Sequence, residues 1–134
     1  MATSAQALIL PGAYAAPYTA GGTIGVGCAV GFPDANGEVA VVTTVAPIMG
    51  IAANAVVSGE EVFVVGFGPA YAKLTGAVTW ATSPFLVPDA AGEFVAAATN
   101  ETSQVRAFPD AREGAAGESS DLIRVVVGVG DFHS

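Results

Sequence analysis

Residues 85–95 have the sequence FLVPDAAGEFV, and this short stretch contains the pattern on which the fold depends. The apolar run Phe85–Val87 is followed by a Pro-Asp pair, two alanines and Gly92, after which apolar residues resume at Phe94. Proline and aspartate favour the start of a tight turn, and a glycine supplies the positive φ angle that such a turn needs. The stretch therefore predicts a β-hairpin.

The same hairpin pattern occurs earlier in the chain. Residues 33–38 have the sequence PDANGE and residues 88–93 have PDAAGE, which differ at one position of the six. Each copy follows an apolar run and precedes another. We interpret the two copies as marks of a duplication, and the alternative is convergence, because these turn residues are common in all proteins.

A second correspondence supports the duplication weakly. Residues 50–65 and residues 111–125 each contain small residues, then a turn of Gly or Ser with acidic residues, then a strong β run. The chain is therefore expected to contain two related β units, at about residues 24–66 and 81–129, joined by a middle hairpin.

Short apolar segments separated by turn residues extend the strand pattern over most of the chain. Their spacing of roughly ten residues is typical of an all-β sandwich or small barrel. The 17 glycines and 8 prolines argue against long helices. One short helical turn is expected at Thr99–Ser103, with Asn100 as its N-cap. The candidate strands are Ile24–Val30, Glu38–Thr44, Pro47–Ala52, Glu61–Gly66, Ala70–Leu74, Phe85–Val87, Glu93–Ala98, Gln104–Phe108 and Leu122–Val129.

The N-terminal residues 1–21 differ from the rest because they carry no charged side chain and contain two prolines. They are expected to form an extended arm that needs a neighbour to bury its apolar side chains, ahead of a single domain at 22–134. The alternative is a first strand of that same domain. The side chains that would make the contact are Leu8, Ile9, Leu10, Tyr14 and Tyr18.

The charge pattern restricts the possible partners. The net charge is −8, and the four cations are far apart in the sequence, so no cluster for nucleic-acid phosphates is predicted. No apolar run approaches the roughly 18 residues that a membrane span needs. Only 12% of residues are charged, which indicates a surface partly covered by partner proteins. No basic leader segment is present, so synthesis and use in the cytoplasm are expected.

The residue types that carry catalysis or bind metals are few and poorly placed. His133, the only histidine, is the second-last residue, and Cys28 lies in an apolar strand pattern. The adjacent pair Glu60–Glu61 would point to opposite faces of a strand. The acidic residues near the two turns, Asp34 and Asp89, lack the spacing of a calcium loop. The sequence therefore predicts no catalytic residue, no cofactor and no metal.

The order of the segments resembles that of small bacteriophage head decoration proteins, also called cement proteins. In those proteins a strand similar to residues 47–52 is followed by a turn and strand similar to 58–64. The hairpin at 85–95 and the closing segment at 111–127 are also similar, although Ser120 stands where the family usually has glycine. The resemblance extends over about residues 22–129.

The resemblance implies a non-enzymatic structural protein of the virion. Such a protein would form a homotrimer on the outer surface of a phage head, bind the major capsid protein and stabilise neighbouring capsid subunits, after synthesis in the host cytoplasm. Three alternatives stay open: a β-rich binding module on a virion surface for host or carbohydrate recognition, another virion part such as a tail component, and an enzyme of unfamiliar type.

Overall fold

Every regular element in the described part of the chain is a β-strand, which confirms the predicted all-β class. The computed structural model describes residues 7–75, 78–79, 85–98, 101–107, 116–117 and 122–133. Its strands are β1 (Tyr14–Ala20), β2 (Ala29–Val30), β3 (Glu38–Val39), β4 (Gly50–Ala52), β5 (Glu61–Lys73), β6 (Val78–Thr79), β7 (Phe85–Pro88), β8 (Phe94–Ala96), β9 (Thr102–Ala107), β10 (Ala116–Gly117) and β11 (Leu122–His133).

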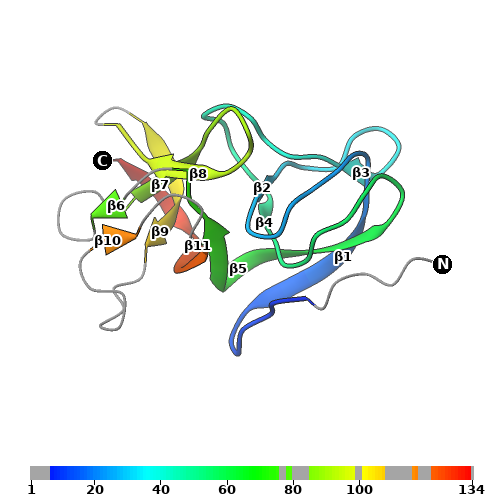
Figure 1. Cartoon of the computed structure of the whole chain (residues 1–134), viewed down its shortest axis with the longest axis horizontal. Helices are drawn as coiled ribbons and strands as arrows, with labels where there is room; N and C mark the ends of the chain where they lie inside the picture. The colour runs from blue at the N-terminus through cyan, green and yellow to red at the C-terminus, as the bar shows by residue number, and fades with distance from the viewer. Residues whose placement is uncertain are drawn as a thin grey trace.

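Most of these strands belong to one sheet that curls into a nearly closed, barrel-like shape. Its main path has the order β2-β4-β5-β11-β9-β7-β8, with neighbouring strands antiparallel. Beside this path, β1 pairs antiparallel with β5 and parallel with β3. In Figure 1, β5 runs between a lobe that holds β1 to β4 and a lobe that holds β6 to β11. Of the two predicted architectures, sandwich and barrel, the barrel-like one is observed.

The long strand β5 corrects the prediction of two strands at Glu61–Gly66 and Ala70–Leu74. Its first part pairs with β1 and β4, and its second part pairs with β11. Phe67, Gly68 and Pro69 separate the two predicted strands, but they belong to β5, and Gly68 has φ 97° within it. A β-carbon on Gly68 would also lie 2.7 Å from the Gly12 carbonyl oxygen, so glycine is required there.

Two other predicted elements are corrected. The strand expected at Ile24–Val30 is reduced to β2, because the chain turns at Gly27 (φ 82°) and Ile24 makes only an isolated bridge with Val56. In the expected helical turn at Thr99–Ser103, the last two residues belong to β9. Thr99 and Asn100 lie outside the described residues.

The two predicted hairpin turns have the same hydrogen-bond geometry. In each turn the aspartate Oδ1 atom, of Asp34 or of Asp89, accepts hydrogen bonds from the backbone N–H groups two and four residues later, at 2.8 and 3.0 Å. The glycines that close the turns, Gly37 and Gly92, have φ 77° and 79°. This agreement is the structural counterpart of the sequence repeat.

The strand pairing repeats as well. The path β2-β4-β5 in one half corresponds to β7-β9-β11 in the other, and the two paths meet where β5 pairs with β11. In the first half β1 pairs with β5, and in the second half the last part of β5 takes the same place beside β11. Gly128 has φ 78° and stands as far after Val125 as Gly68 stands after Val65. These correspondences favour duplication over convergence.

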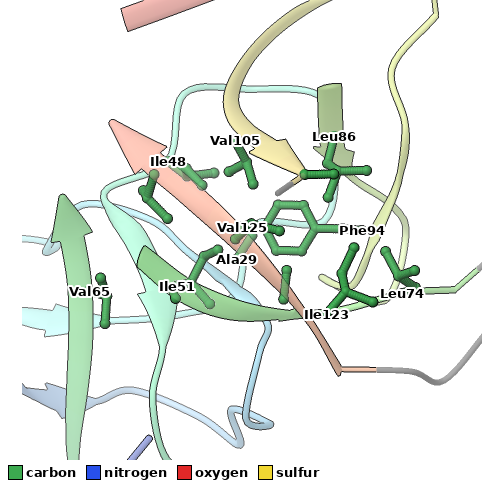
Figure 2. Packing of buried hydrophobic residues seen from close by; sticks show 14 of the residues in the cluster. Ala29, Ile48, Ile51, Val65, Leu74, Leu86, Phe94, Val105, Ile123 and Val125 are labelled. Atoms are coloured by element: carbon green, nitrogen blue, oxygen red, sulfur yellow. The ribbon is translucent and has the colours of Figure 1, made fainter. Parts of the chain in front are cut away.

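Two clusters of buried side chains form the core. The larger one joins both lobes, and Figure 2 shows the Phe94 ring at its centre among Leu86, Leu74 and Ile123. The smaller cluster lies beneath β1 and includes Ala20, together with Val39, Val62 and Cys28. Burial of each large apolar side chain contributes about 1.5–3 kcal/mol. Because β1 covers the second cluster, this strand is part of the folded unit.

Candidate interaction surface

The five contact residues predicted from the sequence lie in two kinds of environment. Leu8, Ile9 and Tyr14 are exposed, with relative accessibilities of 39%, 44% and 68%. Leu10 and Tyr18 are half-buried, and Tyr18 packs against the second core cluster. The first three are therefore available to a partner, whereas Tyr18 has a structural role.

The N-terminal segment is held by the domain from residue 8 onward. The backbone N–H of Leu8 donates to the Ala53 carbonyl at 2.7 Å, and the N–H of Ala13 donates to the Leu10 carbonyl at 3.1 Å where the chain turns into β1. Of the two sequence interpretations of residues 1–21, the structure shows the first strand for Tyr14–Ala20; residues 1–6 lie outside the described part.

An exposed aromatic pair extends the apolar N-terminal surface. Tyr14 of β1 lies directly opposite Phe67 of β5, and Phe67 is 56% exposed. Directly opposite residues of paired strands project from the same face of a sheet. We call Leu8, Ile9, Tyr14 and Phe67 the apolar edge. Sequence reasoning missed Phe67, because its place beside Tyr14 depends on the pairing of β1 with β5.

A second surface covers the side of the β5, β11, β9 and β7 strands that faces away from the core. On the second part of β5, on β9 and on β11 the described buried residues alternate with exposed or half-buried ones, and on β7 Phe85 is half-buried. In the pairing register, Pro69, Val126, Arg106 and Phe85 form one row across the four strands, Tyr71 lies opposite Arg124, and Lys73 lies opposite Leu122. We call these eight residues the outer face.

The outer face collects every cation whose side chain the structure describes. Arg106 is exposed and Arg124 is half-buried. The Lys73 Nζ atom lies 3.4 Å from the Glu93 Oε2 atom, so this cation is already part of an ion pair. The prediction that the cations are not clustered considered only their positions along the sequence, and the strand register brings them to one face.

Three acidic residues lie near one another in the strand register of the other lobe. Thr19, near the end of β1, pairs with Glu38 of β3 on one side and with Glu61 of β5 on the other. The next residue, Ala20, donates its N–H to the Glu60 carbonyl at 2.9 Å. We call Glu38, Glu60 and Glu61 the acidic end. No lysine or arginine occurs before Lys73, so nothing in this lobe's own sequence neutralises these carboxylates.

The catalytic or metal-binding candidates Cys28, Asp34 and Asp89 are buried or bound to the backbone of their own turns. Cys28 is buried, and burial is the main cause that raises its pKa above the ordinary 9.0, followed by the negative charge of Glu93. The Asp34 and Asp89 carboxylates bind backbone N–H groups of their own turns. Within the described ranges, no group of three or more His, Cys, Asp or Glu residues is placed to hold a metal ion. His133 belongs to β11, but its side chain is not among those that the structure describes.

A small cavity lies between the loop at Ala46–Ile48 and the strands β7 and β9. Its volume is about 10 Å³, which is room for a single water molecule. Ser103 and Gln104 supply polar atoms to its wall, but the single proton of the Ser103 hydroxyl is already shared between the Leu86 and Val105 carbonyl oxygens. This cavity is too small for a substrate.

Comparison with models of known protein families gives no match, and comparison with curated proteins gives none either. Among the residues that the structure describes, no helix is long and apolar enough to cross a membrane. The surfaces described above and the resemblance of the sequence segments are therefore what indicates a function.

Proposed function

We propose that this chain is a structural protein of a phage virion that binds the outer surface of the capsid as a homotrimer and stabilises neighbouring major capsid protein subunits. The order of the sequence segments supports this proposal, and the observation that carries it is the apolar edge. Tyr14 and Phe67 are large apolar side chains held side by side on paired strands and left largely in water. Exposed apolar clusters on a folded strand mark protein interaction sites.

The thermodynamics of such a protein explain how it would act. A protein that binds the assembled shell but not its free subunits stabilises the shell by RT ln(1 + [L]/Kd), about 2.7 kcal/mol per site at a hundredfold excess over Kd. The several binding sites of one trimer would raise its overall affinity for the shell, because after the first site binds, the others bind as intramolecular events. The net charge of −8 favours an outward position, because packaged DNA repels an acidic chain.

The test is the temperature at which particles release their DNA. Stripped particles are compared with particles re-decorated with the natural chain, with a Tyr14→Ser/Phe67→Ser variant, and with a Val57→Ser variant as control. Val57 is 55% exposed and lies outside the apolar edge, so its substitution shows the effect of removing an exposed apolar side chain elsewhere. The natural chain and the control should raise the release temperature, and the double variant should not bind.

Equal release temperatures for decorated and stripped particles would exclude the stabilising function. In that case a role in host or carbohydrate recognition, or in another part of the virion, would have to be tested by adsorption assays. Circular dichroism of the double variant must first show the spectrum of the natural chain.

A further inference from the structure

We propose that copies of this chain associate head to tail, with the outer face of one copy seated on the acidic end of the next. The inference deepens the proposed function, because it rests on the homotrimer and names the two surfaces that would form it. The partner is therefore a second copy of the same chain.

The composition of the outer face supports its burial in a protein interface. Tyr71, Phe85, Arg106 and Arg124 lie together on it, and tyrosine, phenylalanine and arginine are enriched at interface cores. Leu122 is 36% exposed and adds apolar area at one end. An antiparallel sheet that served only as a solvated surface would carry polar side chains at these alternate positions.

The acidic end supplies the complementary charge. Glu61 is exposed and belongs to a lobe whose sequence contains no cation before Lys73. In Figure 1, β3 and the start of β5 lie at one end of the long axis, and β9 and β11 lie toward the other. The acidic end and the outer face are therefore two different surfaces of one copy, as a contact between unlike surfaces requires.

Symmetry favours this head-to-tail arrangement over a face-to-face one. A closed ring of three copies is heterologous, so each interface joins two different surfaces of the chain. A twofold dimer through the outer face would instead bring together two faces that both carry Arg106 and Arg124, and like charges in an interface are unfavourable. The local pairing also has to overcome the general repulsion between copies that each carry −8.

A charge-swap experiment tests the proposal on the full chain in solution, without capsids. Light scattering over a dilution series gives the association constant for the natural chain, for Arg106→Glu, for Glu61→Lys, and for the chain that carries both substitutions. Each single variant should associate at least about tenfold more weakly, because one ion pair becomes a repulsion. The double variant should regain association to within about threefold of the natural chain, because the pair is restored with reversed sign.

The control is Ala90→Lys, which adds a charge at an exposed turn outside both surfaces and should leave association unchanged. Raising the salt concentration should reduce the difference between the natural chain and each single variant, because screening weakens both the ion pair and the repulsion that replaces it. The proposal is overturned if the natural chain stays monomeric at all concentrations, or if the double variant fails to recover.

The same variants separate this proposal from the capsid function. If Arg106→Glu leaves self-association intact but abolishes capsid binding, the outer face belongs to the capsid partner and the head-to-tail proposal is wrong. The DNA-release assay with the natural chain tests capsid stabilisation on its own, whichever result the dilution series gives.

Discussion

Asn54 shows how one buried side chain sets the start of the central strand. It is 1% exposed and lies in the turn after β4. Its Oδ1 atom accepts a hydrogen bond from the Phe63 N–H at 2.8 Å, and its Nδ2 atom donates to the Glu61 carbonyl at 3.1 Å. The amide thus satisfies two backbone groups that the β4 to β5 turn leaves unpaired.

Replacing Asn54 with alanine should lower the free energy of unfolding by about 1–3 kcal/mol, since a buried donor and a buried acceptor lose their partner. Urea unfolding followed by circular dichroism measures the loss. Asn36→Ala is the matched control, because that asparagine is exposed and uses only its backbone N–H in the turn; it should cost at most about 0.5 kcal/mol. Equal losses for the two variants would contradict the role given to Asn54.

At the scale of elements, the two Pro-Asp turns combine local geometry with long-range packing. Both use an aspartate to bind two backbone N–H groups, but only the second turn also anchors the other lobe. The Gly92 carbonyl accepts a hydrogen bond from the Ala29 N–H at 2.8 Å, at the start of β2. The turn after β7 therefore joins the two halves, whereas the turn after β2 lies in solvent.

Asp89→Ala should therefore destabilise the protein more than Asp34→Ala. The loss of two side-chain hydrogen bonds should cost about 1–2 kcal/mol in either turn, and the Asp89 change should add a cost from the displaced contact with Ala29. Asp89→Asn keeps the Oδ1 acceptor and is the control, with most of the stability retained. Thermal unfolding of the three variants measures the order, and a larger loss for Asp34→Ala would contradict it.

These elements also show what the sequence can and cannot predict. The turns were predictable because their chemistry lies within a few consecutive residues, and the alternation of apolar residues located most strands. The continuity of β5 was not predictable, because it depends on β1 and β11, which pair with its two parts. The outer face was missed for the same reason: Arg106 and Arg124 are distant in sequence and meet only through the register of β9 and β11.

At the scale of the whole molecule, β1 decides whether the N-terminal segment is an accessory or part of the fold. It pairs with β3 and β5, and Ala20 at its end is fully buried. Removing residues 2–20 would expose the second core cluster and leave one side of β5 without its hydrogen-bonding partner. The truncated chain should therefore lose its cooperative unfolding transition.

Removing only residues 2–9 is the matched control. That truncation keeps β1. It removes the hydrogen bond from the Leu8 N–H to the Ala53 carbonyl, and it removes the exposed side chains of Leu8 and Ile9. It should stay folded, with a melting temperature lower by a few degrees, since roughly 1 kcal/mol corresponds to about 4 °C in a domain of this size. If the longer deletion unfolds with the same cooperativity as the natural chain, β1 is dispensable for folding.

The long strand β5 also has a consequence for how the protein is made on the ribosome. Its first part can pair as soon as it emerges, because β1 and β4 precede it in the chain. Its second part must wait for β11, which begins only at Leu122, so at the normal rate of elongation this edge stays open for several seconds. An open, apolar strand edge is a template for pairing with another nascent chain. Lys73, at the end of the waiting segment, places a positive charge on that edge, and charged edge residues of this kind oppose premature pairing on crowded polysomes.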